Sequence, residues 1–394
     1  MNNIALIRKI CSAGLLVGIA MSLTLWSNQR LFPLAPVFTG MPALPASLEW
    51  GVVGLWGVAL LAVLALPNRW ALAAVYALGA VILIQDQMRW QPWVYTYLLL
   101  LFPFLWDDKP TPATPKMKKA KQELSNFDYI TYVQIFLIGL YFWGGVHKLN
   151  AGFNEVIYPL FVKSLLKLPD GHWLYEAKIF GLLIPVTEIL VGIGLIIPRF
   201  RKIAAIGAIF THLVILLFLS PLGLNDNHIV IPWNMAMIVV VYLSCFNQQQ
   251  KLVLWHPQAD RRRWLAIGLA VLVWLMPALN LRGKWDTYLS FNLYSNNIDH
   301  MYVAVKSASL DKIDNQLSAY FAAQNILDDG KVIDVSDWSF KELNVPVYPE
   351  KRVFNAIARH FCRSGIPADQ LMFVEYRPPL TPGKYRTYTC EKLE

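Results

Sequence analysis

Apolar runs long enough to cross a lipid bilayer recur along the first three quarters of this 394-residue chain. A spanning helix needs about 20 mostly apolar residues, with a range of roughly 17–25. We place the runs near residues 10–27, 50–67, 70–88, 92–106, 129–147, 180–198, 203–221, 231–247 and 264–281, of which the fourth is short. Only 15% of all residues are charged, and the mean hydropathy is +0.41. This pattern predicts an all-α polytopic membrane bundle of about nine transmembrane helices over residues 1–281.

Basic residues fall on alternate sides of these runs and predict the orientation of the chain. The clusters are Arg8 with Lys9, Arg69, KMKKAK at 116–121, RFRK at 199–202 and Arg261–Arg263. If their common side is the cytoplasm, the N-terminus lies inside and everything after Leu281 lies outside. No signal-peptidase site follows the first run, so we expect it to remain as an anchor. The proline-rich segment 107–127 is expected to be a flexible cytoplasmic loop at the lipid surface.

The formal net charge of +9 belongs to the apolar part, because 14 basic and 14 acidic residues balance from Arg282 onward. Such an excess is typical of the positive-inside rule. The sequence shows no basic groove interleaved with aromatic residues, which would indicate nucleic-acid binding. The lipid bilayer is therefore the first expected partner. Short loops and compact size favour a bacterial inner (cytoplasmic) membrane.

From residue 282 the composition becomes that of a soluble domain. HMYVAVKSAS, KVIDVSDWSF and QLMFVEYRP have strand-like patterns, whereas DKIDNQLSAYFAAQN and EKRVFNAIARHFCRSG have helical spacing. We expect residues 282–394 to form a small extracytoplasmic α+β domain. Cys362 and Cys390 lie on the expected outer side, where a disulfide is permitted, although two buried thiols remain an alternative.

Ionisable residues inside the expected spans are the strongest functional signal. A charged side chain at the centre of a bilayer costs roughly 2.5–3.5 kcal/mol on insertion scales. Glu188 lies near the middle of its span, His212 lies within the next, and Lys148 ends the span before them beside His147. A lysine near a helix end can simply reach for water. Three ionisable residues on consecutive spans instead favour a functional cavity, in which a desolvated lysine could act as a free-amine base.

Motifs for other chemistries are absent from the sequence. It contains no Walker loop, no dinucleotide glycine fingerprint after a strand, no HExxH and no paired CxxC. We therefore expect no metal site.

The segment YVQIFLIGLYFWGGVHKLNAGF, which contains Gly144, Gly145 and the basic pair, resembles the span that carries the active-site lysine in vitamin K-dependent γ-glutamyl carboxylases. These enzymes belong to the wider family with horizontally transferred transmembrane (HTTM) domains. DQMRWQPWVYTYLLLL and AIFTHLVI also resemble family segments, and the similarity covers roughly residues 10–247 in matching order.

The resemblance implies a mechanism and a cofactor. Lys148 would deprotonate a reduced naphthoquinone, a vitamin K-type hydroquinone, whose reaction with O₂ yields a base strong enough to abstract a proton from a glutamate γ-carbon before CO₂ addition. His212, Glu188, Gly144, Gly145 and His147 would belong to the quinone pocket, with Trp90, Trp93 and Tyr95 as an aromatic wall. A peptide or protein substrate on the outer face belongs to the same expectation.

Two departures favour quinone binding over glutamate carboxylation. Trp93 stands where the carboxylases have a histidine, and the large lumenal part that binds their propeptide substrate has no counterpart in residues 282–394.

Two further interpretations stay open. TEILVGIGLIIP also resembles small DoxX- and MauE-like membrane proteins, which would make the chain a non-catalytic quinone-binding or redox-accessory protein. Alternatively, the spans anchor an outer interaction domain, although an anchor has no use for Glu188 and His212 within the membrane.

Overall fold

The computed structural model describes residues 3–106, 115–252, 262–322, 329–378 and 385–392, which form two compact units. The first unit comprises Met1–Gly18, Gly57–Tyr76 and Pro92–Ser295, and the second comprises Ile19–Trp56, Ala77–Gln91 and Asn296–Glu394. Three N-terminal helices contribute residues to both units.

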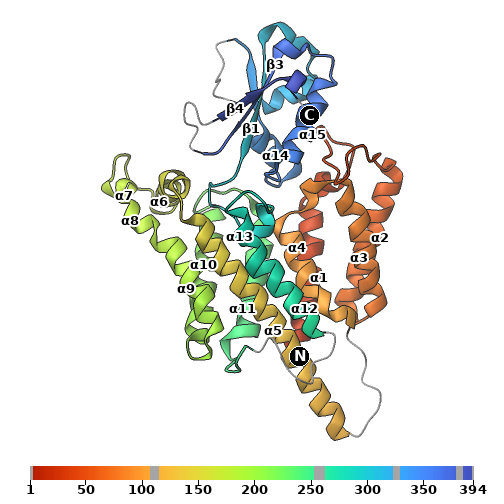
Figure 1. The fold of residues 1–394 in the computed structure, drawn as a ribbon, viewed down its shortest axis with the longest axis vertical. Coiled ribbons are helices and arrows are strands. Elements are labelled where there is room, and N and C mark those ends of the chain that lie inside the picture. Colours follow the sequence, from red (N-terminus) through yellow and green to blue (C-terminus); the bar gives the residue numbers. More distant parts are fainter. Residues whose placement is uncertain (1–2, 107–114, 253–261, 323–328, 379–384, 393–394) are drawn as a thin grey trace. The chain divides into compact units, whose positions relative to one another are not determined.

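Thirteen α-helices, labelled in Figure 1, form most of the described apolar part of the chain. They are α1 (Asn3–Met21), α2 (Ala46–Ala65), α3 (Arg69–Gln85), α4 (Pro92–Leu101), α5 (Pro115–Lys148), α6 (Tyr158–Leu166), α7 (Trp173–Glu176), α8 (Lys178–Gly181), α9 (Leu183–Ile196), α10 (Pro198–Leu219), α11 (Ile231–Val241), α12 (Arg262–Ala270) and α13 (Met276–Asn280).

Six helical segments of the described chain are long and apolar enough to cross a membrane. They are Asn3–Met21, Ala46–Ala65, Tyr129–Lys148, Lys178–Ile196, Pro198–Leu219 and His228–Phe246. The other three expected spans correspond to shorter apolar helices at Arg69–Gln85, Pro92–Leu105 and Trp264–Asn280. The structure therefore supports a helical membrane protein with at least these six candidate spans.

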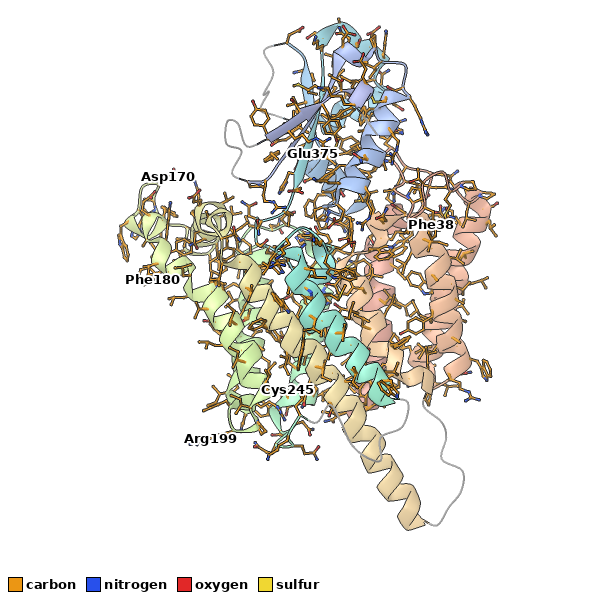
Figure 2. All side chains as sticks on the ribbon, in the orientation of Figure 1. Phe38, Asp170, Phe180, Arg199, Cys245 and Glu375 are labelled. Carbon is orange, nitrogen blue, oxygen red and sulfur yellow. A yellow bond between two sulfur atoms is a disulfide. The ribbon has the colours of Figure 1, made fainter. Side chains whose placement is uncertain are left out.

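Helices α9 and α10 leave large apolar side chains exposed. Leu190, Ile203 and Phe210 are 61%, 69% and 64% exposed. Figure 2 shows side chains projecting outward along this helix pair, with Phe180 and Arg199 near its opposite ends. Contiguous apolar surface of this kind is rare on soluble monomers, and a lipid environment accounts for it.

Helix α5 begins earlier than the sequence pattern predicted. Residues from Pro115 onward are helical, so the loop expected over 107–127 is wrong for that part, while residues 107–114 lie outside the described residues. Proline is well tolerated in the first turn of a helix, and the Lys, Ala, Gln and Glu residues that follow are good helix formers.

The described residues from His300 onward contain one antiparallel sheet in the order β2-β1-β3-β4. The strands are β1 (His300–Val305), β2 (Lys331–Asp334), β3 (Leu371–Tyr376) and β4 (Tyr385–Tyr388), and the helices are α14 (Val335–Leu343) and α15 (Lys351–Cys362). Alternate residues such as Met301, Val303 and Phe373 are fully buried on one face. Trp338 of α14 packs edge-on against Phe361 of α15, with ring centroids 6.0 Å apart.

Two local predictions for this part were wrong. The strand expected over KVIDVSDWSF stops at Asp334, whose side chain accepts hydrogen bonds from the backbone N–H groups of Ser336 and Asp337 and so caps α14. The helix expected from Asp311 onward is replaced, in its described part, by two short 3₁₀ turns, Ser307–Lys312 and Asn315–Tyr320.

The second unit also contains the segments that flank the first membrane helices. Glu342 of α14 accepts hydrogen bonds from the backbone N–H groups of Leu31 and Phe32, at 2.6 and 3.0 Å. The same unit contains a buried network of charged side chains. In this network Arg89 contacts Glu49 at 2.7 Å, and Asp86 pairs with Arg30. Each charge has an opposite partner and none of the four side chains lines the cavity of the first unit, so we assign this network a structural role.

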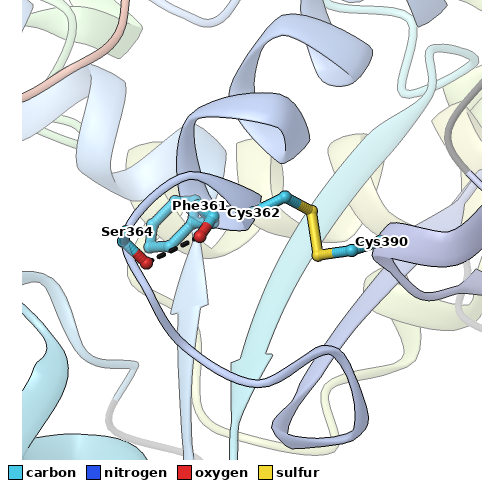
Figure 3. Close-up of a disulfide and its surroundings, with 4 residues drawn as sticks. All are labelled: Phe361, Cys362, Ser364 and Cys390. Carbon is cyan, nitrogen blue, oxygen red and sulfur yellow. Dashed lines mark hydrogen bonds between the residues drawn. A yellow bond between two sulfur atoms is a disulfide. The ribbon is translucent and has the colours of Figure 1, made fainter.

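Cys362, at the end of α15, forms a disulfide with Cys390, with 5.7 Å between the Cα atoms (Figure 3). The bond joins two cysteines that lie 28 positions apart in the sequence. Such a crosslink typically stabilises a small domain by about 2–4 kcal/mol, mainly by restricting the unfolded chain.

Candidate functional site

Helix α5 is the central helix of the first unit. Its Tyr129–Lys148 segment is 83% buried, whereas the other five candidate spans are between 28% and 50% buried. Most side chains of this segment therefore face protein rather than lipid, unlike those on the exposed faces of α9 or α10.

Glycines allow α5 and α9 to pack closely in antiparallel directions. A methyl group built on Gly145 would lie 2.5 Å from the carbonyl oxygen of Pro185, and one on Gly192 would lie 2.8 Å from the backbone nitrogen of Phe142. Small residues at such positions let helix backbones approach each other inside a membrane. This approach places Lys148 of α5 beside Glu188 of α9.

Lys148 and Glu188 form a buried ion pair. Lys148 Nζ lies 2.6 Å from Glu188 Oε2 and donates a second hydrogen bond to the Gly144 carbonyl at 3.1 Å. The two side chains are 11% and 8% exposed. The lysine side chain thus turns back along its own helix and contacts another span, which is the opposite of snorkelling toward water.

The pair borders a cavity of about 50 Å³ in the first unit. Its polar lining residues include Tyr141, Lys148, Glu188, Thr211, His212 and Asn234. One water needs roughly 10–15 Å³ of such space, so the cavity has room for about four waters or for the polar end of a larger ligand.

A chain of three side chains forms another part of the lining. The Tyr141 hydroxyl lies 2.7 Å from His212 Nε2, and His212 Nδ1 lies 2.8 Å from Asn234 Oδ1. Tyr141 and His212 are 4% and 3% exposed, and Asn234 is fully buried. The cavity therefore combines an ion pair with a tyrosine–histidine–asparagine chain.

A non-helical segment after α13 completes the lining with Phe291, Leu293 and Tyr294. Phe291 and Tyr294 have φ angles of +57° and +52°, a left-handed conformation that is uncommon for bulky residues. Hydrogen bonds hold the segment, since Asn150 Nδ2 donates to the Ser295 carbonyl and Asn227 Nδ2 donates to the Tyr294 hydroxyl. Backbone strain of this kind concentrates at functional sites.

The structure brings together four of the residues that the sequence singled out, namely Lys148, Glu188, His212 and Gly144. Gly145 instead faces α9. His147 lies outside the cavity lining, with its ring 5.8 Å from that of Trp143. Within the described part of the chain, neither ring nitrogen of His147 has a hydrogen-bond partner.

The three expected wall aromatics also lie outside the cavity lining. Trp90 donates a hydrogen bond to the Leu83 carbonyl in the second unit, and Trp93 packs against Gly18 in the first. Tyr95 donates to the Tyr288 carbonyl, so it supports the segment that carries Phe291 without reaching the cavity.

Sequence reasoning missed Tyr141, Asn234 and the Phe291–Tyr294 segment. Tyr141 lies seven residues before Lys148, a spacing that places both on one helix face and could have revealed it. Asn234 is a polar residue inside an apolar span, which is a weaker signal of the same kind. No sequence pattern indicated that the segment after α13 lines a cavity, because its composition assigned it to the start of the expected soluble domain.

The lining offers an amine, a carboxylate, an imidazole and hydroxyl groups to a ligand. No three His, Cys, Asp or Glu side chains of the described residues lie together as metal ligands would. Comparison of the chain with protein-family models, with curated proteins and with solved structures finds no match.

Proposed function

We propose that this protein is an integral membrane enzyme of the carboxylase-like type, in which Lys148 takes a proton from the hydroxyl group of a reduced quinone. The buried Lys148–Glu188 pair beside a polar cavity is the observation that carries the proposal. The sequence resemblance supplies the identity of the ligand.

The energetics of the pair support a functional role. Removing two charges from water costs several kcal/mol per ion, and their mutual attraction offsets this cost only in part. The α5–α9 contact could be made by apolar residues at lower cost. Retention of the pair at a cavity is therefore better explained by chemistry than by stability.

The 2.6 Å contact also gives Lys148 a route to its basic form. When a bound ligand displaces water from the cavity, the ammonium can pass its proton to Glu188, which leaves an amine and a neutral carboxyl group. The amine can then accept the proton of a ligand hydroxyl and remain beside the new oxyanion as a compensating cation.

The volume of the cavity supports binding of the polar end of a quinol. About 50 Å³ accommodates a hydroxyl group together with a small molecule such as O₂ or CO₂, whereas pockets that enclose whole drug-sized ligands measure roughly 300–1,000 Å³. The ring system would have to extend past Phe291, Leu293 and Tyr294. When bound, the quinol would supply reaction with O₂, which generates the strong base that the resemblance implies.

The topology is part of the same proposal. We place nine spans in the membrane, counting the three shorter apolar helices, with the N-terminus inside and the sheet-containing domain outside. That orientation puts the Cys362–Cys390 disulfide in an oxidising compartment.

Quinol epoxidation tests the proposal. Purified protein in detergent would receive reduced naphthoquinone and O₂, and chromatography would detect the epoxide. We expect epoxide from the wild type and from Lys163→Ala, which removes a solvent-exposed lysine paired with Asp170, and none from Lys148→Ala.

Absence of epoxide from folded wild type with several quinones would contradict the proposal. That outcome would favour the non-catalytic DoxX- or MauE-like accessory role. Equal yields from wild type and Lys148→Ala would instead contradict Lys148 as the base.

A further inference from the structure

The hydrogen bonds around His212 determine which of its ring nitrogens carries the proton. Asn234 Nδ2 donates to the Val230 carbonyl at 2.9 Å, and a carbonyl can only accept. The other side-chain atom of Asn234, Oδ1, is therefore an acceptor, and His212 Nδ1 must carry the proton in the 2.8 Å contact between them.

The tautomer of His212 in turn fixes the hydroxyl proton of Tyr141. In a neutral imidazole only one nitrogen is protonated, so His212 Nε2 is an acceptor. The Tyr141 hydroxyl lies 2.7 Å from this nitrogen and donates to it. The Trp233 ring packs perpendicular to the imidazole, with the ring centroids 6.2 Å apart, and helps to hold its orientation.

The Tyr141 oxygen consequently offers only lone pairs to the cavity. A ligand hydroxyl can donate a hydrogen bond to it, but a ligand carbonyl cannot. To bind a carbonyl, Tyr141 would have to turn its proton away from His212 and leave a buried acceptor unpaired. Such a loss typically reduces affinity by about tenfold or more.

Tyr141 also lies within reach of a group bound at Lys148. Lys148 Nζ lies 3.8 Å from the position of a methyl group built on Gly144, which is three residues from Tyr141. Tyr141 and Lys148 both line this cavity. A ligand hydroxyl bound there can donate to Tyr141 while Lys148 is an ammonium, and can turn its proton to the amine once Glu188 has taken the lysine proton.

We propose that Tyr141, oriented through His212 and Asn234, is a specificity-determining residue that selects a ring hydroxyl over a ring carbonyl and thereby the reduced over the oxidised form of the ligand. This inference rests on the proposed function, because it takes the ligand to be a quinol. His212 and Asn234 are positioning residues, since they act through Tyr141.

Anaerobic binding of menadione and of its dithionite-reduced hydroquinone tests the proposal, with quenching of tryptophan fluorescence as the signal. We expect wild type to bind the reduced form at least about tenfold more tightly. Tyr141→Phe should bring the ratio close to one. His212→Leu should do the same by releasing the Tyr141 proton to donate to a carbonyl, so affinity for menadione should rise.

Tyr132→Phe is the matched control, because this buried tyrosine of α5 donates to the Leu99 carbonyl and does not line the cavity. Its affinity ratio should equal that of wild type. A variant that only weakens helix packing lowers the affinities for both forms together, so the ratio of the two affinities stays unchanged.

Equal binding of the two forms by wild type, or a ratio that survives Tyr141→Phe, would overturn the specificity role and leave quinone binding intact. Binding of neither form by folded wild type would overturn the proposed function and this inference with it.

Discussion

Gly145 approaches Pro185 so closely that a methyl group on the glycine would lie 2.5 Å from the proline carbonyl oxygen. Its neighbour Gly144 has the opposite surroundings, because the nearest atom to such a methyl group is Glu188 Oε2 at 3.4 Å. Of these two adjacent glycines, Gly145 therefore allows the close contact between the helices, and Gly144 leaves space beside the ion pair.

Alanine substitutions should distinguish these two roles. Gly145→Ala must separate α5 from α9, and we expect it to destabilise the protein by about 1–3 kcal/mol, as is typical of overpacking. Its apparent melting temperature in detergent should fall accordingly. Gly144→Ala fills space next to Lys148 without a backbone clash, so it should melt near the wild-type temperature and reduce quinol turnover. Equal stability of the two variants would contradict this account of the α5–α9 contact.

The Lys148–Glu188 pair should show strong energetic coupling. Removing one partner leaves the other charge buried, so Lys148→Met and Glu188→Met should each destabilise the protein by about 3–5 kcal/mol. The double variant should recover most of this loss and remain inactive. Thermal unfolding of all four proteins gives the coupling, and additive losses in the double variant would argue against a buried pair.

His147 should be dispensable for stability although it adjoins Lys148. It is 2% exposed, and neither ring nitrogen has a hydrogen-bond partner among the described residues. Because an unsatisfied buried polar group costs about 1–3 kcal/mol, His147→Leu should melt at or above the wild-type temperature. A drop as large as that of Lys148→Met would show that His147 has a partner, such as a ligand.

His300, in strand β1 of the second unit, should make stability depend on pH. Burial lowers the pKa of His300 from 6.5 to about 4. Between these values the unfolded chain binds a proton that the folded protein does not, so stability is complete above pH 6.5 and is lost as the pH falls toward 4. The loss from this residue is at most about 3 kcal/mol.

His300→Phe isolates this contribution, since a phenyl ring can keep the stacking on Tyr376, where the ring centroids are 5.5 Å apart. Melting temperatures at pH 7 and pH 4.5 should differ less in the variant than in wild type. An unchanged difference would assign the pH dependence to other groups.

The sequence located the six candidate membrane spans because a spanning segment must be apolar along its whole length, whatever its neighbours. It also pointed to Lys148, Glu188 and His212, because charges are costly in such segments. Tyr141 and Asn234 carry no formal charge, and their importance depends on which side chains they meet. That information lies in the packing of α5, α10 and α11 and not in local pattern.

Other features were hidden for different reasons. The Phe291–Tyr294 segment follows the last apolar run, so composition assigned it to the soluble domain. The inclusion of Leu31 and Phe32 in the same unit as α14 depends on backbone N–H groups, which every residue except proline has and no sequence pattern marks. The helix over Val335–Leu343 was read as strand because its apolar residues directly follow a true strand, and the capping role of Asp334 was overlooked.

Chemical rescue of Lys148→Ala tests the role of Lys148 as the base most directly. The variant would be supplied with reduced naphthoquinone, O₂ and a series of small primary amines of increasing basicity, which can enter the space left by the side chain. We expect epoxide formation to return in proportion to amine concentration and to rise with the basicity of the amine. A variant that is folded and binds the quinol, yet is rescued by no amine, would contradict the assignment of Lys148 as the base.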